Sequence, residues 1–508
     1  MPKASALLPT RVIDVNPSQE PEFPRILETF RQHGDFVALS HCWGTKTRYV
    51  LDSTTRTELL EGMVMSNLPP AFRDAIKVTK GLGYRYLWID SLCILQDSLE
   101  DWDHESGRMQ EYYTNAILTI ALDDTEGDHL GFLDRLRLSD KAAVAVPFST
   151  PEPDSEGGRS VGHPSSEVVH FSYERSQVAH KRTGGFLGRR GWTLQEDILS
   201  VRTVHYKNGR LRWECQEFLG FEGLPHESSG PCHTKYNFLG SIGSLITQGY
   251  HPTWYNIVET YMKRELTFVD DKFPAISGIA KAVAKRVGFE YIAGIWLEDI
   301  HFGLSWFIEG KSERERTYVA PSWSWASIKT PIDGTIQGTR ACHARNDHGG
   351  HYPVNDGQFP MALELIDHEI VSRGKDPFGQ ITHAIIVLRG LLLEFSKWRA
   401  RGSIHIGASF LPDAASSPCS IDCNFDEPSI IRQYGHGEDT LVDPGARILE
   451  DLYLFHIYSP DHYHPGSWLL ILMPTTTEGE FRRVGLARAE TDKVKVAGEW
   501  NLTEVTII

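Results

Sequence analysis

FVALSHCWG, at residues 36–44, is the stretch that decides the expected fold of this chain. Phe36–Ser40 is a short apolar run, and the HCWG that follows it ends in a glycine. Short apolar runs bounded by turn residues are typical of buried strands. We therefore expect a strand that ends at Ser40, with His41 and Trp43 directly after its carboxyl end.

Helices and strands alternate after this first strand. From Pro69 apolar residues recur at helical spacing as far as a pair of glycines, which predicts a helix of about three turns. Tyr86–Ile89 is the next expected strand and places Asp90 at its end. A second helix over residues 102–116 precedes a third strand at Ile117–Leu122. This β-α-β-α-β order predicts a parallel sheet covered by helices.

The alternation ends near residue 220. Asn208 and Gly209 lie between two alternating runs, TVHYK and RLRWE, and form a strong hairpin signal. Before this hairpin, residues 139–165 are rich in Pro, Ser, Gly and acidic residues and show no periodicity, so we expect a disordered, exposed insertion there.

The remainder of the chain changes character twice. Pro274–Val287 has the spacing of an amphipathic helix, whereas the later apolar runs AIIVLRGLLLEF, DLYLFHIY and SWLLILMP are separated by polar turns, as in β-rich folds. We therefore expect four regions: a Pro-rich N-terminal lead-in at 1–35, an α/β domain at 36–220, a helical region at 221–319 and a β-rich C-terminal region at 320–508.

Charge and hydropathy exclude two classes of partner. The formal net charge is −16, and Lys and Arg are dispersed along the chain, so nothing attracts nucleic acid or an anionic membrane. The N-terminus resembles no signal peptide, and no run of about 18 apolar residues spans a bilayer. We expect a soluble, cytoplasmic protein.

The cysteines and glycines predict no metal site and no resident cofactor. Seven cysteines are an odd number and are widely spaced, which favours reduced thiols. Cys419 and Cys423 form a CxxxC pair, but no second pair has fitting zinc-site spacing. Gly184, Gly185 and Gly188 lack both the G-x-G-x-x-G spacing and a P-loop lysine.

Three separated blocks carry a family resemblance: ALSHCWG at 38–44, LWIDSLCILQD at 87–97 and RGWTLQE at 190–196. In order and spacing they resemble the A-L-S-Y-x-W-G, W-I-D-x-x-C-I-x-Q and R-x-W-x-x-Q-E blocks of the HET domain of fungal heterokaryon-incompatibility proteins. His41 replaces the usual Tyr, and Leu95 replaces a frequent Asn. The resemblance extends to about residue 330. The further residues that match the family motifs are Gly44, Trp88, Cys93, Gln96, Trp192 and Gln195.

The resemblance implies a role and a fold. The best-known members of this family trigger programmed cell death after fusion of genetically different fungal hyphae, so it implies non-self recognition in a filamentous fungus. HET domains are also held to be distant relatives of TIR domains, whose sheet is flavodoxin-like. The expected fold class is thus α/β, with a TIR-like parallel sheet in the HET domain.

Two groups of residues are candidates for chemistry. Ligands of open parallel sheets bind outside the carboxyl ends of strands, which makes Ser40, His41, Trp43 and Asp90 candidate nucleotide-binding residues. Glu196 follows Trp192 by one helical turn, and catalytically active TIR domains place their essential glutamate in a similar W-x-x-x-E setting. Cleavage of the nicotinamide–ribose bond requires an anionic group, an aromatic wall and donors to a pyrophosphate. Glu196, Trp43 and the pair Arg189 and Arg190 are the candidates for these three roles.

Two functions remain open at this point. In the first, the HET domain is an enzyme that hydrolyses NAD or a related nucleotide, with NAD as substrate and Glu196 as catalytic residue. In the second, it is a non-catalytic signalling module that self-associates or binds another incompatibility protein. The blocks are then packing determinants: Trp43 and Trp88 fill the core, Asp90 caps a loop, and Glu196 forms a salt bridge.

Overall fold

The described residues of the computed structural model form two compact units. The first comprises Met1–Ser98, Asn115–Gly188 and Ser200–Pro231, and the second comprises Leu99–Thr114, Arg189–Leu199 and Cys232–Ile508. The structure describes residues 6–17, 23–44, 49–134, 143–148, 167–172, 185–207, 209–215, 218–222, 252–309, 313–329, 340–343, 363–398, 404–406, 421–426, 440–442, 450–458, 467–489, 494 and 499–508.

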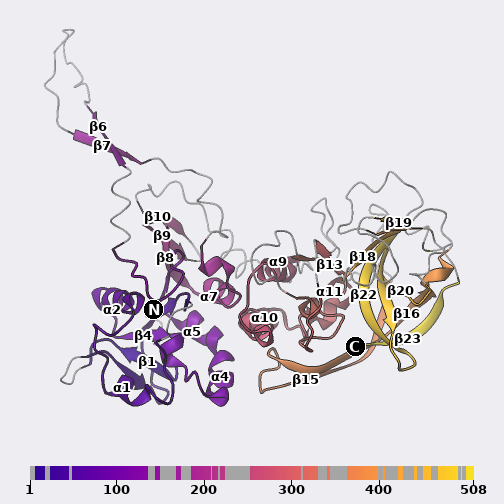
Figure 1. Cartoon of the computed structure of the whole chain (residues 1–508), viewed down its shortest axis with the longest axis horizontal. Coiled ribbons are helices and arrows are strands. Elements are labelled where there is room, and N and C mark those ends of the chain that lie inside the picture. Colours follow the sequence, from indigo (N-terminus) through magenta and orange to yellow (C-terminus); the bar gives the residue numbers. More distant parts are fainter. Residues whose placement is uncertain are drawn as a thin grey trace, which may run out of the picture. The chain divides into compact units, whose positions relative to one another are not determined.

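An eight-stranded sheet forms the centre of the first unit (Figure 1). Its strand order is β10-β9-β8-β5-β3-β4-β1-β2. The four central strands β8, β5, β3 and β4 are parallel, whereas the strands on either side of them are antiparallel to their neighbours. The sheet is therefore mixed, and not all-parallel as expected. The strands are β1 (Arg11–Asp14), β2 (Arg25–Glu28), β3 (Phe36–Ser40), β4 (Tyr86–Ile89), β5 (Leu118–Ala121), β8 (Arg202–Lys207), β9 (Arg210–Cys215) and β10 (Leu219–Phe221).

The positions and burial of the central strands agree with their apolar composition. All five residues of β3 are buried, as expected for a strand covered on both faces. β4 has the predicted bounds, and β5 is one residue shorter at each end than predicted. The lead-in, for which no element was expected, contains β1 and β2. Local sequence does not predict β1, because β1 pairs with β4, more than 70 residues further along the chain.

The helices of the first unit flank the parallel strands. They are α1 (Arg56–Glu61), α2 (Pro70–Gly81) and α3 (Asp90–Cys93). α2 begins with a proline, which lacks the N–H that a first helical turn leaves unpaired, and it buries Phe72, Ala75, Ile76 and Thr79 as its spacing predicts. α3 starts directly at the end of β4, so Asp90 stands at a strand-to-helix junction.

Two hairpins complete this unit. β8 and β9 pair from Lys207 with Arg210 onward, and Gly209 has φ +69°, as the predicted hairpin requires. β6 (Ala143–Phe148) and β7 (Glu167–Ser172) form a second antiparallel hairpin. β6 thus occupies part of the predicted insertion at 139–165, whose other residues lie outside the described part of the chain.

The second unit begins with helices from the α/β segment. The helix expected over 102–116 is divided at Gly107 into α4 (Leu99–Ser106) and α5 (Met109–Asn115). α7 (Thr193–Leu199) packs against α10 (Pro274–Val287), which has the bounds predicted from sequence. The other helical elements are η2 (Leu187–Arg189), which spans the boundary between the units, α9 (Pro252–Tyr261), η4 (Val269–Asp271), η5 (Leu297–Asp299), α11 (Ile300–Gly303), η6 (Trp325–Ser327) and η7 (Phe395–Lys397).

The segments YIAGIW at 291–296 and APSWSWAS at 320–327 pack on one another around Gly294. Its carbonyl oxygen accepts hydrogen bonds from the indoles of Trp254 at 3.0 Å and Trp325 at 2.8 Å. Gly294 has φ +100°, and a Cβ at this position would lie 2.7 Å from the Trp325 indole nitrogen. Only glycine fits both constraints. The paired strands of this part are β11 (Tyr291–Ile292) with β12 (Ile295–Trp296) and β13 (Trp306–Glu309) with β14 (Arg340–His343).

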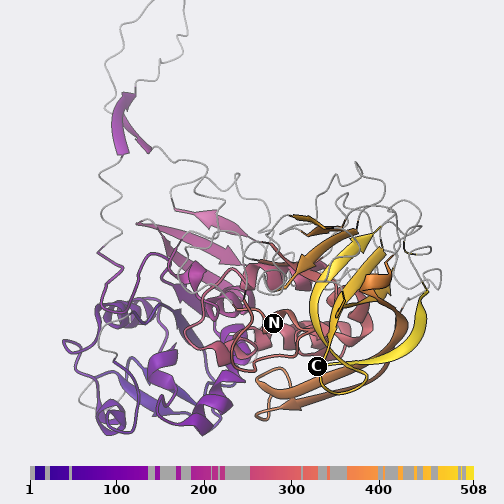
Figure 2. The same ribbon diagram turned by 45° about the vertical axis from the view of Figure 1, so that its right-hand side comes forward.

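The C-terminal part is a barrel-like sheet, in agreement with the β-rich region predicted. β16, β20, β21, β22 and β23 pair in a closed ring, because β23 pairs with both β16 and β22. Figure 2 shows the last strands of the chain curving around this ring. The strands of this sheet are β15 (Leu363–Ser372), β16 (Ile381–Glu394), β17 (Ile404–Ile406), β18 (Ile421–Phe425), β19 (Thr440–Val442), β20 (Tyr453–Tyr458), β21 (Ser467–Pro474), β22 (Glu480–Ala489) and β23 (Asn501–Ile507).

A buried arginine joins the barrel to β13. The guanidinium of Arg483 lies 3.5 Å from the ring centroid of Trp306 and donates to the carbonyl oxygen of Leu304 at 2.8 Å. Asp426 lies 3.3 Å from Arg483 and 2.9 Å from Arg314, and it is fully buried.

Among the described residues, no helix has both the length and the apolar character needed to cross a bilayer.

Candidate functional site

Asp90 is the centre of a polar group at the carboxyl edge of the first unit's sheet. β3 and β4 run side by side in parallel, with Leu39 paired to Ile89, so the residues that follow the two strands meet. The indole N–H of Trp43 donates to Asp90 Oδ2 at 2.9 Å. The backbone N–H of Ser91 donates to the other carboxylate oxygen at 2.7 Å. Both oxygens of Asp90 are therefore held by donors.

His41 lies close to the same carboxylate. Its Nδ1 lies 3.7 Å from Asp90 Oδ1, and its ring packs edge-on against Phe72 with centroids 5.2 Å apart. His41 and Ser40 are both buried, whereas Trp43 and Asp90 keep part of their surface exposed. Of the four residues predicted at this edge, Trp43 and Asp90 are thus the two that a ligand can touch directly.

The remaining residues of the second block support the loop after β4. The side-chain amide of Gln96 donates to the backbone carbonyl oxygens of Asp90 at 3.2 Å and Ile94 at 2.9 Å. Cys93 is fully buried, and its carbonyl oxygen accepts from Arg11 Nε at 2.7 Å. Trp88 is also fully buried. For these three motif residues the contacts are those of structural residues.

Gly44 allows the loops after β3 and β5 to meet. It has φ +78°, and a Cβ there would lie 3.0 Å from the Cα of Gly127, in the loop that follows β5. A side chain at Gly44 would therefore be strained and would push this loop away. β3 and β5 are the neighbouring strands at which the order of the parallel strands reverses direction, which is where open sheets bind ligands.

The third block belongs to the second unit. Arg189 is exposed, Arg190 is half-buried, and Glu196 is only 4% exposed on α7. Trp192 and Gln195 make hydrogen bonds to Asp271 and Gly278 of the same unit. Ser40, His41, Trp43 and Asp90 are thus brought together within the first unit, whereas Arg189, Arg190 and Glu196 are held within the second.

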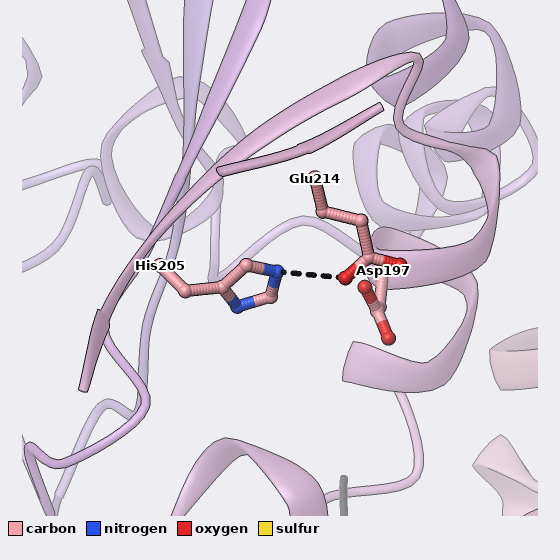
Figure 3. Close-up of side chains that lie close together, drawn as sticks. All are labelled: Asp197, His205 and Glu214. Atoms are coloured by element: carbon pink, nitrogen blue, oxygen red, sulfur yellow. Dashed lines mark ion pairs between the residues drawn. The ribbon is translucent and has the colours of Figure 1, made fainter. Parts of the chain in front are cut away.

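The structure adds a buried histidine that sequence reasoning missed. His205 Nδ1 lies 3.2 Å from Asp123 Oδ1, and Nε2 lies 3.5 Å from Glu214 Oε2, as Figure 3 shows for the second pair. Burial alone would lower the pKa of His205, but the hydrogen bond to Asp123 and the nearby carboxylate of Glu214 outweigh it and raise the pKa. Asp123 follows β5 after one intervening residue, Leu122, and no local motif marks any of these residues.

His205, Asp123, Glu214 and Arg212 form an ion-pair network in the first unit. These residues of the first unit do not by themselves make a complete metal site. His205 Nε2 and Glu214 Oε2 have the separation of two ligands on one ion, but Arg212 Nη2 lies 3.4 Å from the same carboxylate oxygen. A guanidinium beside a ligand oxygen repels a cation and neutralises the carboxylate. Asp197, also labelled in Figure 3, is a residue of α7 in the second unit. The absence of a metal site stays a prediction.

Comparison with known families agrees with the three sequence blocks. Residues 36–196 match the family model described as heterokaryon incompatibility protein (HET). The chain contains a HET domain. The matched segment of this HET domain starts at β3 and ends at Glu196, so it includes all three blocks. No curated protein and no solved structure matches the chain.

Within the HET domain, the three blocks serve two different units. The first two blocks surround Asp90 at the sheet edge of the first unit, and the third block forms the start of α7 in the second. α4 and all but the last residue of α5, which lie inside the matched segment, also belong to the second unit. The HET segment is therefore not a compact unit by itself.

Proposed function

We propose that this HET domain binds NAD or a related nucleotide at the carboxyl edge of its sheet and hydrolyses the nicotinamide–ribose bond. In this proposal the protein is a fungal incompatibility effector, and loss of the nucleotide contributes to cell death. The proposed cellular role rests on the match of residues 36–196 to the family model described as heterokaryon incompatibility protein (HET). The chemistry rests on the residues described above.

The observation that carries the proposal is the pair of Trp43 and Asp90. Both are partly exposed at the carboxyl end of adjacent parallel strands, and the 2.9 Å hydrogen bond fixes the indole. The parallel strands follow the spatial order β4-β3-β5-β8, which is the 2-1-3-4 order that flavodoxin-like sheets also have. A fixed indole face suits stacking of a flat base, as in other nucleotide sites.

The reaction assigns one role to each candidate group. Water adds to the ribose carbon as the bond to nicotinamide breaks, and the products are nicotinamide, ADP-ribose and a proton. The Glu196 carboxylate stabilises the oxocarbenium-like charge that develops on the ribose. Glu196 is only 4% exposed, so little water screens the interaction of its carboxylate with such a charge. Arg189 and Arg190 are the donors for the pyrophosphate.

A second function is favoured by the packing contacts of the motif residues. Trp88 and Cys93 are fully buried, and Gln96, Trp192 and Gln195 each make hydrogen bonds within their own unit. Packing and hydrogen bonding alone account for these motif residues, with no role in catalysis. The alternative is a non-catalytic signalling module that acts by self-association or by binding another incompatibility protein.

The two functions make opposite predictions for Glu196→Gln. This change keeps the size of the side chain and removes its charge, so the enzyme proposal expects release of nicotinamide from NAD to fall about a hundredfold. The measurement is a product assay on the purified full chain. Glu111→Gln, on the exposed surface of α5, is the matched control and should leave the rate unchanged. A parent protein that releases no nicotinamide would favour the signalling module. A Glu196→Gln variant with full activity would contradict the catalytic role proposed for Glu196.

A further inference from the structure

The backbone of the third block is bound to the residues that precede η4. The Gly191 N–H donates to the Glu265 carbonyl oxygen at 2.8 Å, and the Glu265 N–H donates to the Arg189 carbonyl oxygen at 2.5 Å. Arg264 Nη1 donates to the Arg190 carbonyl oxygen at 3.2 Å and to the Thr193 hydroxyl at 3.0 Å. The segment that leads into α7 is thus hydrogen-bonded to the helical region like one strand to another.

Two motif residues, Trp192 and Gln195, make further hydrogen bonds to the helical region. The Trp192 indole N–H donates to Asp271 Oδ2 at 2.9 Å, and its ring packs edge-on against Trp102 of α4, with centroids 6.2 Å apart. Gln195 Oε1 accepts from the backbone N–H of Gly278 in α10 at 3.2 Å. α7 has seven residues, fewer than a helix needs to be stable in isolation. Its order therefore depends on these contacts.

η4 is itself contacted by the C-terminal sheet. Arg373 Nη1 lies 3.2 Å from Asp270 Oδ2, and the side-chain amide of Gln380 donates to the Asp270 carbonyl oxygen at 3.1 Å. Both residues lie at the turn between β15 and β16. In the same turn, Asp376 lies 2.7 Å from Lys281 of α10. The turn thus contacts Asp270, which precedes Asp271. It also contacts α10, whose Gly278 binds Gln195.

We propose that Asp271 is a positioning residue that holds α7, and with it Glu196, through the indole N–H of Trp192. The β15–β16 turn supports it by fixing Asp270. The consequence for catalysis rests on the function proposed above for Glu196, whereas the consequence for the order of α7 does not. The order of α7, which belongs to the HET domain, therefore depends in part on the C-terminal sheet.

Asp271→Ala and Asp271→Asn in the full chain separate positioning from general packing. Alanine removes the acceptor for the indole, whereas asparagine keeps an acceptor oxygen in the same place. We expect amide hydrogen exchange in the peptide 190–199 to speed up about tenfold in Asp271→Ala and to stay within about twofold of the parent in Asp271→Asn. Peptides from β16 and β20 are the internal reference, and Asp367→Ala, on the exposed side of β15, is the matched control.

Nicotinamide release from NAD gives the second readout. Asp271→Ala should lower kcat and raise KM, because the loosened segment carries both Glu196 and Arg190, and Asp271→Asn should restore both. Unchanged exchange of 190–199 in Asp271→Ala, or an equal acceleration in Asp271→Asn, would overturn the proposal. If the parent cleaves no NAD, the proposed catalysis fails, and the exchange of 190–199 alone still decides whether Asp271 positions α7.

Discussion

At the scale of single residues, His205 is the group whose charge has the clearest consequence. It is buried between Asp123 and Glu214, and its raised pKa means that the folded protein binds a proton more tightly than the unfolded chain does. The imidazolium then compensates the buried carboxylates of Asp123 and Glu214, the second of which also has Arg212 beside it. The cluster is therefore a pH-dependent contribution to the stability of the first unit.

The sign of this dependence can be tested. A group with a raised folded pKa stabilises fully below its unfolded value, 6.5 for histidine, and the contribution disappears as pH rises through the folded pKa. We predict that His205→Gln lowers the melting temperature of the full chain most at pH 6 and progressively less above pH 6.5. Thermal melts of parent and variant across this range measure it, and a constant difference between the two would contradict it.

At the scale of elements, Gly278 sets the distance between α7 and α10. A Cβ at this position would lie 2.6 Å from Gln195 Oε1, 3.0 Å from Gln110 Cβ and 3.1 Å from Leu199 Cδ1. Alanine is ordinarily the better helix former by about 1 kcal/mol. At Gly278 the steric conflict outweighs that gain, because all three neighbours are side chains of other helices and two of them, Gln195 and Leu199, are buried.

Gly278→Ala should therefore destabilise the chain by about 1 to 3 kcal/mol, the usual cost of overpacking. Gly81→Ala is the matched control, since Gly81 also lies in a helix, α2, and has no neighbour within 4 Å of the added methyl group. It should be neutral or slightly stabilising. Urea denaturation of both variants gives the comparison. Equal effects at the two positions would mean that α7 and α10 are not closely packed.

The elements also show where sequence reasoning succeeds and where it stops. β4 and α10 have the predicted bounds because each is encoded by a local pattern, a short apolar run or an amphipathic period. β1 was missed because its place depends on pairing with β4. Asp90 and Trp43 could be predicted as neighbours from their positions after parallel strands. His205 could not, since its partners come from β9 and from the loop after β5.

At the scale of the whole molecule, the HET segment and the compact units divide the chain differently. A boundary near residue 220 follows from the hairpin signal, yet α4, α7 and all but the last residue of α5 belong to the second unit together with the C-terminal sheet. The periodicity of α7 predicts a helix but not its neighbours. Gly191 illustrates why: a Cβ there would lie 2.4 Å from Leu266, a contact that no local pattern encodes.

A fragment of residues 1–220 tests this division directly. It keeps every block of the HET match but lacks Glu265, Asp271, Gly278 and Lys281, which contact residues 189–199 or the residues Gly107 and Gln110. We predict that β3 and β5 stay protected from hydrogen exchange in the fragment, whereas the peptide 190–199 exchanges at least about a hundredfold faster than in the full chain, as local opening approaches free exchange. The strands are the internal control for a folded sheet. Equal protection of 190–199 in fragment and full chain would show that the HET segment orders α7 without the C-terminal regions, and would remove the dependence inferred for Glu196.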